Sequence, residues 1–111
     1  MPTRRAIFAA ASLAAPAAHS QEAWPQRAVT MIVPWAPGGS NDVVGRLLAP
    51  ALEARLRQPF VVENRPGGGG SVGMALAMRA RPDGLTVFIS SASNHVFHPL
   101  IANETSYDVR E

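Results

Sequence analysis

Three segments that combine glycine with serine are the parts of this sequence whose residue types and spacing could do chemistry. The first is Gly68-x-Gly70-x-x-Gly73, the spacing of a dinucleotide-binding loop. That class of loop needs an acidic residue at the end of the following strand to hold a ribose. Here the corresponding run ends in Ile89-Ser90-Ser91 and contains no acid. We therefore interpret the segment as a tight loop before a helix and expect no cofactor.

The second segment, Gly69-x-Ser71-x-Gly73, matches the nucleophile elbow of serine hydrolases. Asp83 and His95 follow in the chain order that these enzymes use. The elbow serine, however, directly follows its strand, whereas Ser71 lies eight residues beyond Glu63. A helix N-cap accounts for Ser71. An exported hydrolase that uses Ser71 is the alternative function, and we expect no catalytic residues.

The third segment is Pro34-Trp35-Ala36-Pro37-Gly38-Gly39-Ser40-Asn41-Asp42, which leads from a strand into a helix. Ligands of open α/β sheets bind at the carboxyl edge of the strands. Unpaired backbone N–H groups and the helix dipole make such a place suitable for an anion, particularly a carboxylate. Gly38 and Gly39 would let a ligand approach the backbone closely. The alternative is an ordinary capped turn, and physics alone does not choose between the two.

His95 and His98 have the spacing of two metal ligands on one face of a helix. No third histidine and no acidic residue accompanies them nearby, and Pro99 argues against a helix at this place. We therefore expect no metal site.

Alternating strands and helices must position these segments. The runs Val29–Val33, Phe60–Val62 and Leu85–Ile89 are short, apolar and partly β-branched, which predicts buried strands. With a helix in each interval, the order predicts an α/β fold, a parallel βαβαβ sheet with right-handed crossovers. Such a sheet needs helices on both faces, and the polar tail from Ile101 to Glu111 offers no further cover. We infer part of a larger protein, or a chain that pairs with another.

Each predicted helix begins near a serine. Ser40 is expected to be the N-cap of the first helix, with Asp42 in its first turn. Ser71 is expected to cap the second. Pro50 should kink the first helix or break off its last turns. The helical spacing of apolar residues predicts the face that the first helix buries, namely Val44, Leu47, Leu48, Ala51, Leu52 and Leu56.

The N-terminus has the pattern of an export signal. Thr3-Arg4-Arg5 precedes an apolar run from Ala6 to Ala18, and Ala18-His19-Ser20 offers small residues where a signal peptidase reads. We expect cleavage after residue 20 and a periplasmic location. The paired arginines fit a twin-arginine signal loosely. The run is shorter than the roughly 20 apolar residues that span a bilayer.

Charge and composition exclude several classes of partner. The 111 residues carry ten basic side chains, all arginine, and eight acidic ones, a net charge of +2. Removing residues 1–20 leaves eight of each and no net charge. A nucleic-acid partner would require a basic stripe and aromatic stacking platforms, and aromatics make up only 6%. The absence of cysteine excludes disulfides and thiolate metal sites.

Five ordered motifs resemble the periplasmic receptors of the tripartite tricarboxylate transporter system, the Bug family. They cover essentially the whole chain after residue 20, which makes them more specific than any single glycine pattern. The motifs are Trp24-Pro25-x-Arg27-x-Val29-Thr30, the segment from Ile32 to Asp42, Arg46-Leu47-Leu48-Ala49-Pro50, the segment from Val61 to Gly69, and Arg81-Pro82-Asp83-Gly84.

The resemblance implies a two-domain, Venus-flytrap receptor that is not an enzyme. Such receptors bind a small organic anion, such as a di- or tricarboxylate, between the domains and deliver it to membrane transporter components. The family's chain is longer, so residues 21–111 are expected to be the N-terminal part of domain 1, with the second domain absent. One ligand loop would lie before the first helix and another after the third strand. The implied ligand-binding residues are Ala36, Pro37, Gly38, Gly39, Ser40, Asn41, Asp42, Ser91, Ser93 and Asn94.

Two positions depart from the family pattern. Asn41 stands where the family often has threonine, and His98-Pro99 stands where it often has Asn-Pro. Asn41 can still donate a hydrogen bond. The resemblance therefore preserves the ligand class and leaves the identity of the ligand open.

Overall fold

A computed structural model describes residues 22–97 of the chain. The predicted export signal, His98 and the polar tail lie outside these residues. The described part is a three-stranded parallel sheet in the order β2-β1-β3, which confirms the predicted α/β class. Its elements are β1 (Val29–Val33), α1 (Ser40–Leu56), β2 (Phe60–Asn64), a 3₁₀ turn (Gly68–Gly70), α2 (Ser71–Arg79), β3 (Thr86–Phe88) and a π-helical turn (Ser93–Phe97).

The central strand β1 has the bounds that the sequence predicts. It pairs with both neighbours, Val29 lying opposite Phe60 and Met31 opposite Val87. Four of its five residues are buried, as expected for a strand that is covered on both faces. The edge strands differ from prediction at their ends, because β2 continues to Asn64 and β3 spans only Thr86–Phe88.

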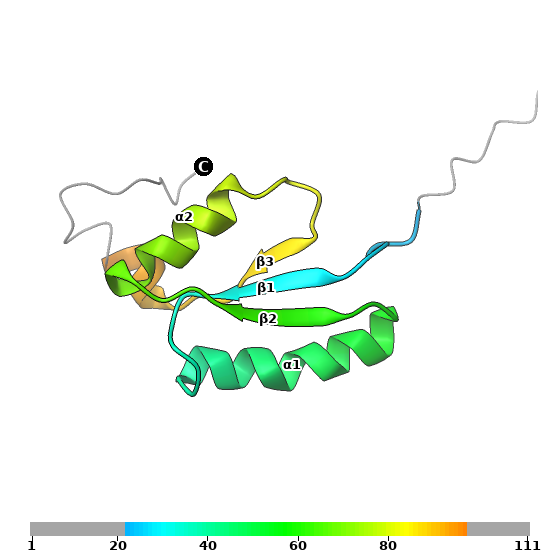
Figure 1. Cartoon of the computed structure of the whole chain (residues 1–111), viewed down its shortest axis with the longest axis horizontal. Coiled ribbons are helices and arrows are strands. Elements are labelled where there is room, and N and C mark those ends of the chain that lie inside the picture. Colours follow the sequence, from blue (N-terminus) through cyan, green and yellow to red (C-terminus); the bar gives the residue numbers. More distant parts are fainter. Residues whose placement is uncertain (1–21, 98–111) are drawn as a thin grey trace, which may run out of the picture.

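The sheet lies between the two helices (Figure 1). Ala49 of α1 packs into the core cluster with Val29, Met31 and Phe60. Ile32 points to the other face, because side chains alternate along a strand, and it is also buried. Met74 of α2 is buried as well. Both faces of the short sheet therefore have a helix, and each helix runs back from the carboxyl edge of the strands (Figure 1).

The predicted buried face of α1 is wrong for most of its residues. Val44, Leu47 and Leu48 are exposed, whereas Gly45 and Ala49 face the sheet. A Cβ at position 45 would lie 2.8 Å from Ile89 Cδ1, so the missing side chain is what lets the helix approach the strands. Of the six residues predicted to be buried, only Leu52 and Leu56 pack against the core, and they are partly buried.

Two expectations about the ends and continuity of the helices are also wrong. Gly39, not Ser40, is the N-cap of α1, and Gly70, not Ser71, is the N-cap of α2. Both serines are instead the first residues of their helices. Neither helix has a side-chain capping bond at its N-cap. Pro50 does not break α1, which is continuous to Leu56 because its inner face stays packed on β1 and β2. No helix within residues 22–97 has the length and apolarity required to cross a bilayer.

Candidate functional site at the carboxyl edge of the sheet

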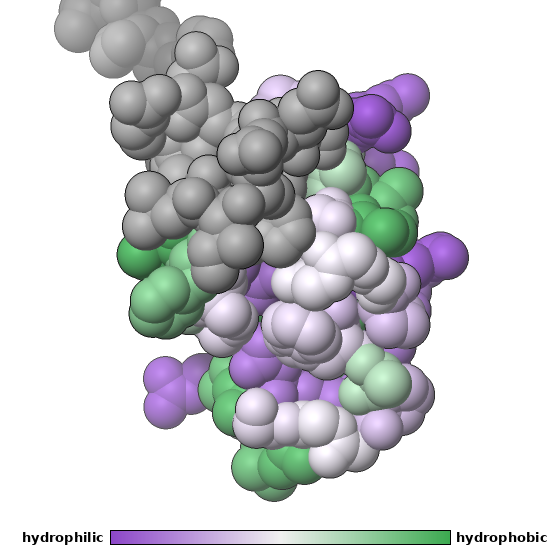
Figure 2. Space-filling view, turned by 90° about the vertical axis from the view of Figure 1, so that its left-hand side faces the viewer, coloured by the Kyte–Doolittle hydropathy of each residue, from purple (hydrophilic) through white to green (hydrophobic). Residues whose placement is uncertain are grey.

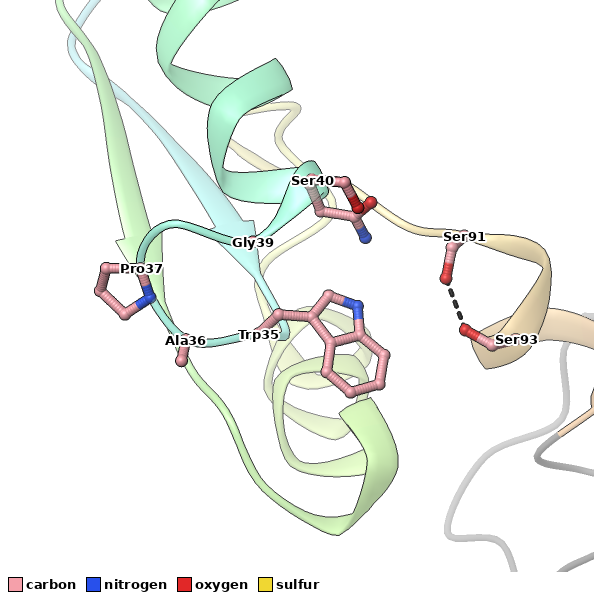
Figure 3. A pocket seen from close by; sticks show the side chains of 8 residues that line it. Trp35, Ala36, Pro37, Gly39, Ser40, Ser91 and Ser93 are labelled. Carbon is pink, nitrogen blue, oxygen red and sulfur yellow. Dashed lines mark hydrogen bonds between the residues drawn. The ribbon is translucent and has the colours of Figure 1, made fainter.

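The loops that follow β1 and β3 meet at the carboxyl edge of the sheet, because parallel strands end at the same side. Between them lies a depression of about 450 Å³. Its walls are formed by Trp35, Ala36, Pro37, Gly39, Ser40, Asn41, Ser91 and Ser93. Figure 3 shows Trp35 and Ser40 on one side and Ser91 with Ser93 on the other. Seven of the ten predicted ligand residues thus surround one space.

Weakly polar residues dominate the surface at this edge. Figure 2 looks onto the carboxyl ends of the strands and shows mostly white to pale purple atoms, with stronger hydrophilic patches between them. The sequence contains no lysine, and no arginine among residues 22–97 lines the depression. The groups that this part of the chain offers to an anion here are therefore neutral hydrogen-bond donors.

The first wall of the depression, formed by residues 35–41, provides such donors at the beginning of α1. The first N–H groups of a helix have no acceptor within it, and in α1 they belong to Ser40, Asn41 and Asp42. The earliest helical bond runs from the N–H of Val43 to the carbonyl of Gly39. The side-chain Nδ2 of Asn41 is also buried and has no hydrogen-bond partner within residues 22–97. This wall therefore presents unused N–H groups beside the depression.

Asp42 holds the first wall in shape from behind. It is buried, and its Oδ2 accepts the N–H of Gly38 at 2.9 Å. Arg46 Nε donates to the same carboxylate at 3.0 Å. The bond from Gly38, then those from Arg46 and Asn64, lower the pKa of Asp42 from 3.8 to about 2. Asp42 and Gly38 were predicted to contact ligand, but they do not line the depression.

Asn64 is a supporting residue that the prediction missed. Its Nδ2 donates to the carbonyl of Trp35 and to Asp42 Oδ1, both at 2.9 Å. Arg46 Nη2 donates in turn to Asn64 Oδ1 at 3.1 Å. The end of β2 is thereby tied to the loop after β1. The available signal was a polar residue at a strand end, inside the motif from Val61 to Gly69. Trp35, which borders the predicted loop, was not among the predicted ligand residues either.

The second wall of the depression, formed by Ser91 and Ser93 after β3, is held in place by a series of hydrogen bonds. Ser91 Oγ and Ser93 Oγ lie 2.6 Å apart (Figure 3), and Ser91 Oγ donates to Asn94 Oδ1 at 3.2 Å. Asn94 Nδ2 donates to the carbonyl of Gly69 at 3.2 Å. Asn94 is fully buried, so it holds the second wall against the loop before α2 rather than lining the depression.

The expectation that no helix forms around His95 is wrong. Pro99 disfavours a helix at this place, but His95 lies in the π-helical turn Ser93–Phe97. Its ring packs edge-on to Phe88 with centroids 6.5 Å apart. No cluster of metal-ligating side chains occurs among the described residues, a statement that does not extend to His98.

Close packing explains the glycines of the dinucleotide-like motif. Gly70 has φ +96°, and a Cβ there would lie 1.9 Å from Asn94 Nδ2. A Cβ at Gly73 would lie 3.0 Å from both Pro34 Cα and the carbonyl oxygen of Arg65. The space that a pyrophosphate would need before this helix is thus occupied by Asn94.

The structure does not assemble the alternative catalytic triad. Ser71 begins α2 at the carboxyl edge. Asp83 lies in the turn that enters β3 at the opposite edge, where it accepts the N–H of Leu85 at 2.9 Å and pairs with Arg27 at 3.4 Å. Figure 1 shows that the length of the sheet separates the two ends. The acid therefore cannot orient a histidine beside Ser71.

Comparison with known proteins decides the family. Residues 44–111, more than half of the chain, match the tripartite tricarboxylate transporter family receptor. The chain belongs to this family. It is 46% identical over 87 residues to Protein BugT of Bordetella pertussis, covering 78% of this chain and 26% of BugT. The resemblance that the five motifs indicated is confirmed, and so is the assignment to a receptor family rather than an enzyme family.

Two solved structures of similar proteins have the same fold as the described part of this chain. MatC from Rhodopseudomonas palustris with bound malate superposes with a TM-score of 0.76 at 32% identity, covering 79% of this chain and 30% of MatC. An R. palustris protein solved with adipate gives a TM-score of 0.76 at 33% identity, covering 78% and 29%. The chain thus spans between a quarter and a third of the length of these relatives.

Proposed function

We propose that this chain contributes part of the ligand site of a periplasmic receptor for small organic anions, chiefly di- or tricarboxylates. The observation that carries the proposal is the set of unused N–H donors at the start of α1, including the buried Nδ2 of Asn41, beside an open depression. Helix N-termini of this kind favour carboxylates through their N–H groups and dipole.

The charge of Asp42 does not oppose this proposal. Its carboxylate is turned away from the depression, toward Gly38, Arg46 and Asn64. The guanidinium of Arg46 compensates its charge at 3.0 Å. An anion beside Ser40 and Asn41 would therefore meet N–H donors without facing an uncompensated carboxylate.

The family and two relatives support the ligand class. MatC was solved with malate and another receptor with adipate, and both ligands are dicarboxylates. By analogy, the ligand would be enclosed with a second domain and passed to membrane components of a tripartite transporter. We propose that residues 21–111 correspond to the first part of domain 1 of these receptors.

Export through residues 1–20 completes the proposal. It rests on Thr3-Arg4-Arg5, the apolar run that follows, and the small residues around residue 20. The chain is expressed in a Gram-negative host, and intact-mass spectrometry is performed on the periplasmic fraction. We expect a product that begins at Gln21. An uncleaved chain retained in the cytoplasm would contradict the export proposal and leave the ligand proposal standing.

Ligand-detected NMR tests binding, because it reports weak complexes. A few hydrogen bonds in an open site must offset the lost translational and rotational freedom of the ligand, so we expect dissociation constants on the order of 1 mM. Saturation-transfer signals should appear for malate and adipate and be absent for their uncharged diamides. Equal signals from the diamides, or signals from sugars alone, would contradict an anion receptor.

A further inference from the structure

Strand β2 forms one edge of the sheet, and alternate residues along it turn their backbone groups outward (Figure 1). The strand bonds to β1 through the carbonyl of Pro59, at 2.9 Å, and through the N–H of Arg65, at 2.8 Å. Residues that bond to one neighbour alternate along a strand. The N–H and C=O groups of Phe60, Val62 and Asn64 therefore point away from β1. Among residues 22–97 no strand pairs with them.

A groove of about 420 Å³ runs beside this edge, between β2 and α1. Its apolar lining consists of Ala49, Pro50, Phe60, Val61 and Val62. Arg46 lies at one end, where its Nη2 donates to Asn64 Oδ1 at 3.1 Å. Glu53 follows two helical turns later and lies toward the other end of β2, because α1 runs back from the carboxyl edge (Figure 1). The groove thus has a cation at one end, an anion at the other and apolar residues between.

Both charged groups can accommodate a further partner. Arg46 is exposed and donates from Nε to Asp42 at 3.0 Å and from Nη2 to Asn64, while its Nη1 has no hydrogen-bond partner within residues 22–97. The exposed carboxylate of Glu53 makes no hydrogen bond or ion pair in that part of the chain. A surface with opposite charges at its two ends is complementary to itself after a half-turn, which is the requirement for a symmetric dimer.

From this complementarity we infer that two copies of the chain pair through the outer edge of β2. The two β2 strands run antiparallel about a two-fold axis at Val62, and Phe60 of each copy lies opposite Asn64 of the other. The same half-turn brings Glu53 of each copy beside Arg46 of the other. The outward backbone groups are then paired, and two sheets of three strands become one of six.

This pairing leaves the ligand sites open. Because the two β2 strands are antiparallel, the carboxyl edges of the two copies lie at opposite ends of the joined sheet. The depression is lined by the loops after β1 and β3, and none of its residues lines the groove. Arg46 keeps its bonds to Asp42, behind residues 35–41, which form the donor wall of the depression. Dimer formation is therefore independent of the proposed ligand binding.

Sedimentation velocity of the wild-type chain over a concentration series tests the dimer itself. One strand pair and two ion pairs make a small interface, for which we expect a dissociation constant on the order of 10–100 µM. The sedimentation coefficient should rise from that of a monomer to that of a dimer across this range and then stay constant. A monomer at every concentration up to about 1 mM, or continued growth beyond a dimer, overturns the inference.

A charge reversal in the groove tests which surface is used. Glu53→Lys replaces both ion pairs with like-charge contacts to Arg46 and should weaken the dimer by at least about tenfold. Glu22→Lys is the matched control, because it makes the same charge change outside the groove. It should keep the wild-type dissociation constant. A dimer that Glu53→Lys leaves unchanged would use another surface and would contradict the inference.

Single cysteines test the register, because the chain has no cysteine of its own. In Val62→Cys the two Cα atoms would lie about 5.5 Å apart across the axis, within the range of a disulfide. In Val61→Cys they would be diagonal neighbours about 7–8 Å apart, too far without backbone movement. Mild oxidation should therefore cross-link Val62→Cys at least about tenfold faster, although Val61 is the more exposed side chain at 53%. Equal rates, or faster cross-linking at position 61, would contradict the register.

Discussion

Two loops of this chain follow a strand, contain several glycines and lead into a helix, yet only one of them borders open space. Gly38, before α1, and Gly70, before α2, have nearly the same backbone φ angle, +91° and +96°. Nothing lies within 4 Å of a Cβ built at Gly38, whereas one built at Gly70 would collide with Asn94. Similar loop chemistry therefore has two uses, an open donor wall and a packed support.

The difference is made by residues that are distant in the sequence. Asn94 fills the loop before α2 and joins it to the second wall. The loop before α1 is held from behind by Asp42 and Asn64, which leaves its front free. A glycine-rich turn before a helix is thus a candidate site only where no buried side chain occupies it.

The largest expected effect comes from substituting the two glycines in turn. Gly38→Ala should cost only the backbone strain of a left-handed residue, about 1–2 kcal/mol. Gly70→Ala adds the collision with Asn94, for a total of about 2–5 kcal/mol. Urea unfolding monitored by circular dichroism measures both. Equal losses of unfolding free energy would mean that packing does not distinguish the loops.

A negative charge introduced on the donor wall should weaken binding by at least about tenfold. Asn41→Asp replaces the buried donor with an anion, which repels a carboxylate ligand. Asn41→Thr is the matched control, because threonine keeps a hydroxyl donor. NMR titration with malate at pH 7 compares the two. Wild-type affinity in the aspartate variant would show that the anion binds elsewhere.

The support behind the donor wall should be sensitive to acid. The pKa of Asp42 is about 2 in the folded chain against 3.8 as its ordinary value. Its stabilising contribution is therefore present above about pH 4 and is lost as the pH falls toward 2. Asp42→Asn, which cannot ionise, should show a smaller loss of stability over that interval. Urea midpoints measured from pH 5 to pH 2 provide the comparison, and parallel curves would contradict the role of Asp42.

The smallest effect is expected at Ser71, the first residue of α2 after the packed loop. Its side chain makes no capping bond to α2, so Ser71→Ala should change stability by less than about 0.5 kcal/mol. Malate affinity should stay at the wild-type value. Incubation with activated esters tests the hydrolase alternative, and any turnover that disappears in Ser71→Ala would contradict the receptor account.

Local pattern was sufficient for the presence and order of the strands, for the bounds of β1 and for the location of the loops, but not for the ends of β2 and β3. Val29–Val33 is a β-branched run ended by proline, and its bounds were predicted correctly. The face of α1 was not, because the residues that pack closest to the sheet are Gly45 and Ala49, whose small side chains contribute little to an apolar pattern. The large apolar residues Leu47 and Leu48 indicated a face that is exposed in the described residues.

The candidate site was predictable as a set of residues and not as a geometry. Motifs placed the two loops at the same edge, and seven of ten residues surround the depression. The distinction between residues that line it and residues that support it depends on contacts between remote positions. Asp42 and Asn94 were assigned to the ligand because they belong to the two loops that the family resemblance implies, and the hydrogen bonds that their side chains make here lie within the protein.

Mapping amide shift changes on both loops during one malate titration tests the central claim most directly. The account predicts the largest changes at Gly39, Ser40 and Asn41, with further changes at Ser91 and Ser93. The amides of Gly68 and Gly69 should move little, because Asn94 already fills that loop. Shifts concentrated at Gly68–Ser71, with the loop before α1 unchanged, would contradict the assignment of the ligand site.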